Sequence, residues 1–279
     1  MQKKLVTLLT IAGSDCTGGA GIQADIRAAA ACGVYAMSAV TTVTAQNSNG
    51  VANLFPVPSN CLESQLKALT EDVIPDAVKI GMIGSVKNCE IIADYIESLP
   101  NSTPIVIDPV LTSSAGGELS DNKKLLADAM ISRLFPLSDV VTPNIKEADY
   151  FLGRNLDSIN PASTQDIAWE LLNIFNSKSV ILKGGHISGN TLVDTLVIKD
   201  YPDTPNKYYT KRIECKNLHG TGCTYASILA SELAKNNTME QAFLKASSMI
   251  NDIISKSIDY DFGSSAYGPL NTLDYITKM

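Results

Sequence analysis

Apolar and polar positions along the chain follow two alternating patterns. Short apolar runs rich in Val, Ile and Leu are typical of buried strands, whereas apolar residues spaced three or four apart form one face of a helix. The expected strands are 5–12, 34–44, 77–81, 104–108, 140–142 and 179–183. The expected helices are 21–32, 59–70, 86–98, 123–134, 147–152 and 163–175. This alternation predicts an α/β fold, a parallel sheet with crossover helices on both faces.

The pattern changes in the last third of the chain. Segments 191–198 and 208–215 alternate apolar and polar residues on either side of the turn-rich segment 201–206, which predicts a hairpin at one end of the sheet. Two helices, 222–234 and 240–255, are expected to close the chain. Since no repeat, low-complexity tract or linker interrupts the sequence, all 279 residues are predicted to form one domain.

The first apolar run has two interpretations. Lys3 and Lys4 precede it, and a charged start before an apolar stretch is also how a secretory signal begins. A buried strand is favoured, because the run ends at Gly13 and the glycine-rich segment 18–21 leads directly into an amphipathic helix. We therefore expect a cytoplasmic protein.

Composition and charge exclude several classes of function. The chain carries 22 Lys and Arg against 29 Asp and Glu, so its net charge is −7 with both His residues neutral. This acidity, without a basic run to offset it, argues against a nucleic-acid partner. No apolar stretch approaches the roughly 20 residues that span a bilayer, so no membrane partner is expected. The six cysteines are scattered without a C-x-x-C pair, which disfavours a zinc site or a disulfide framework.

Ligands of parallel α/β sheets bind at the carboxyl ends of the strands, so the residues that follow each expected strand are the candidates for chemistry. After the first strand, the spacing Gly19-x-Gly21-x-x-Ala24 matches the dinucleotide-binding fingerprint. That fingerprint needs an acidic residue about 20 positions later. No Asp or Glu occurs between Asp25 and Glu63. An NAD-dependent dehydrogenase is therefore disfavoured, and a simple turn remains the alternative use of these glycines.

Asp25 and Gln46 each leave two interpretations open. Asp25 borders the apolar stripe of the helix at 21–32, where a carboxylate is either solvated or directed into the cleft beside the glycines. Gln46 follows the second expected strand. A neutral amide there either caps a loop or binds the donor and acceptor edge of a heteroaromatic ring.

Charged residues follow three further strands. Asp108 ends the strand at 104–108, and Glu147 lies shortly after 140–142. Carboxylates at two strand ends on one rim suit Mg²⁺, held together with water and a substrate phosphate, whereas helix N-caps are the alternative. Lys183 ends the strand at 179–183 and precedes two glycines. It is either placed to approach a polyphosphate or solvated in a turn.

The segment 219–224, which opens the helix at 222–234, is the most informative. Backbone N–H groups at a glycine-rich helix N-terminus form an anion hole, strengthened by the helix dipole, that stabilises a transferring phosphoryl group. Cys223 is expected in the first turn, where a thiolate is favoured. A hydrolase built on Cys223 and His219 is the alternative, disfavoured because no third orienting residue is evident.

Seven segments in register resemble the hydroxymethylpyrimidine/phosphomethylpyrimidine kinases of thiamine biosynthesis, in the ribokinase-like superfamily. They are 9–15, 18–25, 79–82, 108–110, 142–144, 183–186 and 219–224, and 268–271 also matches. The resemblance implies a three-layer α/β/α fold with a mostly parallel central sheet of about nine strands, assembled as a homodimer. It also implies ATP and Mg²⁺ as cofactors, and phosphorylation of 4-amino-5-hydroxymethyl-2-methylpyrimidine and then of its monophosphate.

The resemblance assigns a role to each matching position. The pyrimidine contacts are Gly13, Asp25, Gln46, Met82 and Val110. The Mg²⁺ ligands are Asp108 and Glu147, and the ATP phosphates contact Asn144 and Lys183. The anion hole is formed by Gly220, Thr221 and Gly222. Cys223 stands where sugar kinases of the superfamily carry an aspartate base, beside the hydroxymethyl group.

The chain also departs from the family pattern. The flap segment 113–117 lacks the lysine or threonine often found there, Cys16 replaces a Ser or Pro, and Tyr225 replaces a smaller aliphatic residue. The main alternative function is a pyridoxine/pyridoxal kinase, because some relatives accept both rings and share the cysteine-containing anion loop. A secreted binding protein is a third alternative.

Overall fold

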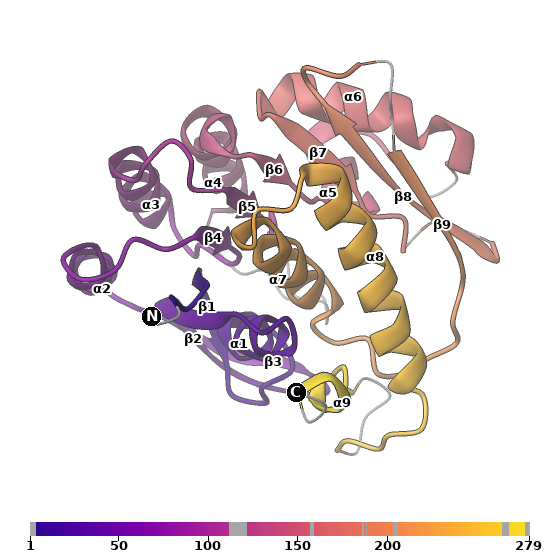
Figure 1. The fold of residues 1–279 in the computed structure, drawn as a ribbon, viewed down its shortest axis with the longest axis horizontal. Coiled ribbons are helices and arrows are strands. Elements are labelled where there is room, and N and C mark those ends of the chain that lie inside the picture. The colour runs from indigo at the N-terminus through magenta and orange to yellow at the C-terminus, as the bar shows by residue number, and fades with distance from the viewer. Residues whose placement is uncertain are drawn as a thin grey trace.

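A nine-stranded sheet formed by the described residues runs through the molecule, with helices on both faces (Figure 1). The computed structural model describes residues 4–111, 122–156, 159–185, 187, 189–202, 206–263 and 268–276. The strands are β1 (Thr7–Asp15), β2 (Tyr35–Asn47), β3 (Gly50–Pro56), β4 (Ala77–Ile80), β5 (Ile105–Ile107), β6 (Val140–Val141), β7 (Ser179–Leu182), β8 (Thr191–Ile198) and β9 (Asn206–Lys211).

The helices follow the strands closely along the chain. They are α1 (Gly21–Ala31), α2 (Ser59–Thr70), α3 (Val86–Ser98), α4 (Lys123–Ala129), α5 (Ile145–Leu152), α6 (Thr164–Phe175), α7 (Thr221–Ala234), α8 (Met239–Lys256) and α9 (Leu273–Ile276). A π-helical segment, Met130–Leu134, and a 3₁₀ turn, Phe135–Leu137, continue α4, and a second 3₁₀ turn, Pro161–Ser163, leads into α6.

Six neighbouring strands are parallel, in the spatial order β2-β1-β4-β5-β6-β7. Each connection between them contains at least one helix, as parallel pairing requires. β3 pairs antiparallel with β2, while β8 and β9 continue the opposite edge antiparallel to β7 and β8. The predicted three-layer architecture with a mostly parallel sheet of nine strands is thus confirmed for the described part of the chain.

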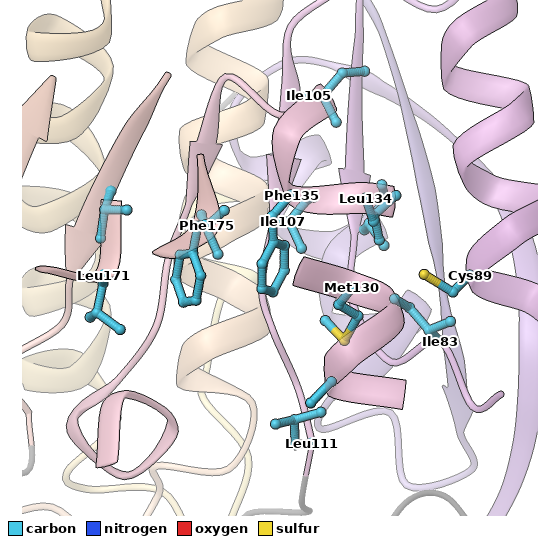
Figure 2. Packing of buried hydrophobic residues seen from close by; sticks show 14 of the residues in the cluster. Ile83, Cys89, Ile105, Ile107, Leu111, Met130, Leu134, Phe135, Leu171 and Phe175 are labelled. Carbon is cyan, nitrogen blue, oxygen red and sulfur yellow. The ribbon is translucent and has the colours of Figure 1, made fainter. Parts of the chain in front are cut away.

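Alternate residues of β1 pack on opposite faces of the sheet. Leu9 and Ile11 belong to a buried cluster with α2, α3, α4, α5 and α6, whereas Leu8 belongs to a second cluster with α1, α7 and α8. Figure 2 shows part of the first cluster, in which the ring centroids of Phe135 and Phe175 lie 4.5 Å apart. Because the central strands are apolar on both faces, they are recognisable in the sequence as short continuous apolar runs.

Helix α7 lies between α1, α8 and the sheet (Figure 1), and every residue from Thr224 to Ala234 is buried. Its polar Ser231 is accommodated by a hydrogen bond to the carbonyl oxygen of Ser227, at 2.7 Å. Packing on all sides fixes the N-terminus of α7 at the carboxyl edge of the sheet. Although α7 is strongly apolar, neither it nor another helix in the described ranges is long and apolar enough to cross a membrane.

Some elements differ from the sequence-based expectations. The apolar pattern does not predict β3, because its residues are all exposed or half-buried. β9 spans Asn206–Lys211 rather than 208–215. Its pairing ends where Lys211 faces Thr191, the first residue of β8, so the register and not the composition sets its end. The short α9 follows the two helices that were expected to close the chain.

Candidate active site

The carboxyl ends of β5 and β7 bring two of the predicted residues into contact. The ammonium of Lys183 donates a hydrogen bond of 2.7 Å to Oδ1 of Asp108. Gly222, at the start of α7, lies against the same pair: a Cβ there would be 3.3 Å from Asp108 Oδ2 and 3.4 Å from Lys183 Nζ. One cation, one carboxylate and the N-terminus of a buried helix therefore meet at one point.

The first turn of α7 requires glycine where it meets the β1–α1 loop. Gly220 has φ +82°, and a Cβ there would lie 1.9 Å from the carbonyl oxygen of Gly19. Within the described residues, no side chain caps this helix. Thr221 donates its hydroxyl to the carbonyl of Leu218 at 2.7 Å and its N–H to the same oxygen at 3.2 Å. Of the three residues expected to form the anion hole, Thr221 thus has its N–H paired within the turn, whereas Gly220 and Gly222, together with Cys223, have no backbone acceptor among the described residues. Their contact with an anion stays a prediction.

Cys223 is only partly exposed, and its surroundings overturn one expectation. Burial raises the pKa of its thiol to about 11, which outweighs the ammonium of Lys79 and a hydrogen bond from the Gly21 backbone N–H, both of which lower it. The carboxylates of Asp25 and Asp108 raise it further. The expectation that the helix N-terminus favours a thiolate is wrong for the free protein, in which Cys223 carries its proton near neutral pH.

Asp25 is fully enclosed by the protein. Its side chain has no exposed surface and forms an ion pair with Lys79, whose side chain is also fully buried. Asp25 also accepts hydrogen bonds from Thr10 Oγ1 at 2.5 Å and from Ser227 Oγ at 2.8 Å. The direct pyrimidine contact expected for Asp25 therefore needs correction, because its oxygens are surrounded by protein donors.

Lys79 is a functional candidate that was expected only as a member of the matching segment 79–82. It lies in β4, in the buried segment Ala77–Ile80, opposite Thr10 of β1. Burial lowers the pKa of the Lys79 ammonium, but the charges of Asp25, Cys223 and Asp108 and the hydrogen bond to Asp25 together keep it above its ordinary value. A lysine inside an apolar strand is the signal that could have identified it, since such a charge needs a buried partner.

The expected ring contacts lie at the ends of β1 and β2. A Cβ at Gly13 would be 2.9 Å from Met82 Sδ, so the thioether lies directly against this glycine. Gln46 donates a side-chain hydrogen bond to Asp15, next to the β1–α1 loop. Val110 follows Asp108 in a tight turn, its N–H bonded to the Asp108 carbonyl at 2.8 Å. Their contact with a pyrimidine stays a prediction.

Asp15 and His219 form a contact that sequence reasoning missed. His219 Nε2 lies 2.9 Å from Asp15 Oδ2 and joins the β1–α1 loop to the loop before α7. Burial would raise the pKa of Asp15, but hydrogen bonds from His219, Gln46, Thr17 and Ala20 hold it well below its usual value. Asp15 is thus a carboxylate that orients His219, but the groups with the largest effect on the pKa of the Cys223 thiol are Lys79, Asp25, Asp108 and Gly21, not His219, so the arrangement does not support a Cys–His hydrolase. Nothing in the sequence links two residues 204 positions apart.

The Asn144 and Glu147 side chains form the capping box that was the alternative to a metal site. Asn144 N–H donates to Glu147 Oε2 at 2.8 Å, and Glu147 N–H donates to Asn144 Oδ1 at 3.0 Å. Burial raises the pKa of Glu147 to about 7, an effect that Lys183 reduces and Asp108 increases. The cap occupies one oxygen of Glu147 and leaves the other for a cation.

The donor set at this point fits Mg²⁺. Within the described ranges, no three His, Cys, Asp or Glu side chains gather as metal ligands. Mg²⁺ in phosphoryl-transfer enzymes commonly takes only one or two carboxylates and completes its shell with water and substrate phosphates. Asp108 and Glu147, both buried and mutually repulsive, are such a pair. The metal role of these residues stays a prediction.

The turn after Lys183 is held by a buried polar network. Asp194 of β8 accepts the N–H of Gly184 at 2.8 Å and the hydroxyl of Ser247 at 3.3 Å. Ser247 in turn contacts the hydroxyl of Tyr225 at 3.2 Å, which explains the large residue at that position of α7. The flap 113–117 and His186 lie outside the described residues.

Comparisons with known proteins identify relatives of this chain. A family model described as phosphomethylpyrimidine kinase matches residues 15–271. A hydroxymethylpyrimidine/phosphomethylpyrimidine kinase of Staphylococcus aureus (strain MSSA476) is 38% identical over 275 residues, covering 97% of this chain and 94% of the relative.

Two solved structures are also similar. A phosphomethylpyrimidine kinase of Clostridium difficile 630 has a TM-score of 0.74 at 34% identity, covering 88% of this chain and 98% of that one. The pyridoxal kinase of Staphylococcus aureus in complex with pyridoxal has a TM-score of 0.84 at 27% identity, covering 97% and 94%.

Proposed function

Because the chain belongs to the phosphomethylpyrimidine kinase family, we propose that it phosphorylates 4-amino-5-hydroxymethyl-2-methylpyrimidine and then its monophosphate with ATP, in thiamine biosynthesis. One structural observation carries the proposal: the uncapped N-terminus of α7, within the described residues, lies against the Lys183–Asp108 pair. This is an arrangement suited to a migrating phosphoryl group. We further propose that the protein is cytoplasmic and that it forms a homodimer. Light scattering, which measures the mass of the particle in solution, tests the homodimer.

Phosphoryl transfer passes through a loose transition state and depends mainly on alignment and charge neutralisation. In our proposal, the N–H groups of Gly222 and Cys223 and the ammonium of Lys183 bind the transferring group. When bound to Asp108 and Glu147, Mg²⁺ would neutralise charge on the ATP phosphates. Asn144, whose backbone N–H donates to Glu147 Oε2, orients this carboxylate and is proposed to contact the ATP phosphates.

Cys223 is proposed to position the hydroxymethyl oxygen and to accept its proton late in the transfer. The thiol is protonated in the free protein, since burial raises its pKa to about 11, so it acts as a base only in molecules in which it has first released its own proton to water. Only its thiolate can accept a proton, and a base with a raised pKa holds that proton more firmly. Turnover is therefore expected to increase with pH as the thiolate fraction increases.

An ADP-release assay on three acceptors tests the proposed substrates: the hydroxymethylpyrimidine, its monophosphate and pyridoxine, with product masses recorded. We expect one and then two added phosphates on the pyrimidine. In the same assay, Cys223→Ala should lose about 100-fold in turnover. Cys61→Ala changes an exposed cysteine on α2 and should retain full activity. Near-normal turnover of Cys223→Ala would remove this residue from the mechanism.

Pyridoxal kinase activity is the second candidate, favoured by the backbone likeness to the pyridoxal kinase described above. Gln46, fixed beside Asp15, is proposed to bind the amino-pyrimidine edge. Pyridoxine carries a phenolic hydroxyl in place of the amino group, and a polar group that binding buries without a partner costs about 1–3 kcal/mol, or roughly a 5- to 150-fold preference for the pyrimidine. A preference for pyridoxine in the three-acceptor assay would reverse the assignment.

A further inference from the structure

The Lys79–Asp25 pair is a fully buried salt bridge with an unusually complete set of protein partners. Lys79 Nζ lies 2.9 Å from both carboxylate oxygens of Asp25. The hydroxyls of Thr10 and Ser227 donate to the same carboxylate. One strand pair, β1 and β4, and two helices, α1 and α7, thus each contribute a group.

Such a pair is weak evidence for stability. Burying two charges costs several kcal/mol per ion, and apolar residues of similar volume often stabilise a fold equally well or better. Its location therefore needs a different explanation.

The pair lies one helical turn below Cys223. Ser227, which donates to Asp25, follows Cys223 by four positions in α7, so both side chains occupy the same face of the helix. The residue that follows β4 is Gly81, which lies against the ammonium: a Cβ there would be 2.7 Å from Lys79 Nζ. Any other residue there would displace the ammonium.

The charged groups that act on Cys223 come from several elements. Lys79 in β4 stabilises its thiolate, and Asp25 in α1 and Asp108 after β5 oppose that effect. Lys183 after β7 also interacts with the thiolate. Of the two partners in the buried pair, Lys79 has the larger effect on the pKa of Cys223, so the pair as a whole favours the thiolate.

We propose that the Lys79–Asp25 pair is a fixed dipole beneath the active site, in which Lys79 is a positioning residue that stabilises negative charge on Cys223. The dipole cannot rearrange when substrates bind, because Thr10 and Ser227 hold the carboxylate on the side away from solvent. It therefore supplies its field without reorganisation, as preorganised electrostatic stabilisation requires. Its effect on turnover rests on the proposed role of Cys223, but its effect on the thiol does not.

Alkylation of the apoprotein by iodoacetamide tests this inference directly. The rate is measured in EDTA, so that no bound cation contributes, by mass spectrometry of the peptide that carries Cys223. Lys79→Met leaves Asp25 unopposed and should slow alkylation about tenfold or more, since one unit of thiol pKa corresponds to a factor of ten in thiolate. Asp25→Asn leaves Lys79 unopposed and should accelerate it by a similar factor.

The essential result is that the two variants change the alkylation rate of Cys223 in opposite directions. General loosening of the fold would instead expose the thiol and accelerate alkylation in both variants. The peptide with the exposed Cys61 is the internal control and should react at one rate throughout. If either single variant fails to fold, the double variant Lys79→Met/Asp25→Asn decides. Because Lys79 has the larger effect of the two on the Cys223 thiol, the double variant should be alkylated more slowly than the wild type. Equal rates in the double variant, or changes of the same sign in both single variants, would overturn the inference.

Turnover separates this inference from the proposed role of the cysteine. Lys79→Met should lower kcat about tenfold and leave KM for the pyrimidine unchanged, because the pair touches no substrate. If alkylation follows the predicted order but kcat does not change, the dipole is supported and Cys223 is not the proton acceptor. If KM changes instead of kcat, Lys79 acts on binding and the positioning role is wrong.

Discussion

Two lysine–aspartate pairs lie in the same site and differ in access to solvent. Lys183 and Asp108 are 2.7 Å apart with side chains 13% and 3% exposed, whereas Lys79 and Asp25 are 2.9 Å apart and both 0% exposed. The first pair faces the start of α7, where in our proposal each partner exchanges the other for a phosphate or a cation. The second is closed by protein hydroxyls. Solvent access, not residue type, separates the pair that we propose to bind ligands from the pair that we propose to supply a fixed field.

Breaking the open pair should have the largest effect on catalysis. Lys183→Met removes the cation beside the proposed phosphoryl site, and turnover in the ADP-release assay should fall about 100-fold or more. The matched control is Lys178→Met, which removes a lysine paired with Asp139 at 2.8 Å on the surface. Equal activity of the two variants would mean that Lys183 does not contact the transferring group.

Breaking the closed pair should instead have its largest effect on stability. Lys79→Met leaves Asp25 buried without its cation, which typically costs about 3–5 kcal/mol in the free energy of unfolding. Denaturant titration measures this loss. Adding Asp25→Asn should recover most of it, because no uncompensated charge then remains. Lys67→Met, in an exposed pair with Glu71, should change stability by less than about 1 kcal/mol.

A small change at Gly222 should separate activity from stability. In Gly222→Ala the added Cβ would press on Asp108 Oδ2 and Lys183 Nζ, at 3.3 and 3.4 Å, and so push the open pair apart. We expect about a tenfold loss of turnover with an unchanged or slightly higher melting temperature. Gly185→Ala, where a Cβ meets no atom of the described residues within 4 Å, is the control for activity.

The weakest expected effect concerns the contact between Asp15 and His219, which joins the β1–α1 loop to the loop before α7. The pKa of Asp15 lies well below its ordinary value, so its contribution to stability is present above about pH 4 and is lost as the pH falls through the folded pKa. Asp15→Asn should therefore flatten the acid side of the stability curve between about pH 5 and 2. The exposed Asp72→Asn serves as control. A curve as steep as that of the wild type would contradict the assignment.

The sequence predicts this fold well where each element carries its own signal. The expected helices at 59–70 and 86–98 match α2 and α3, because apolar spacing and flanking turns define them locally. β3 carries no such signal, since its residues are exposed or half-buried and its pairing with β2 defines it.

The residues of the site likewise divide into those that the sequence predicts and those that it does not. Residues at strand ends, such as Asp108 and Lys183, are predictable because the parallel topology gathers them at one edge. The partner of Lys79 is not, because Asp25 lies 54 positions away and belongs to a helix whose rotation the sequence does not specify. The protonation of Cys223 also depends on burial that only the folded chain supplies.

The contact between Gly220 and Gly19 has a consequence for biosynthesis of the protein. The turn that is proposed to bind phosphate rests on a carbonyl from the first strand-to-loop unit, about two hundred positions earlier in the chain. A growing chain cannot complete this turn until the last third of the polypeptide has emerged and docked. Catalytic competence would thus arrive at the end of folding, and a truncated or half-assembled chain could not consume ATP at this site.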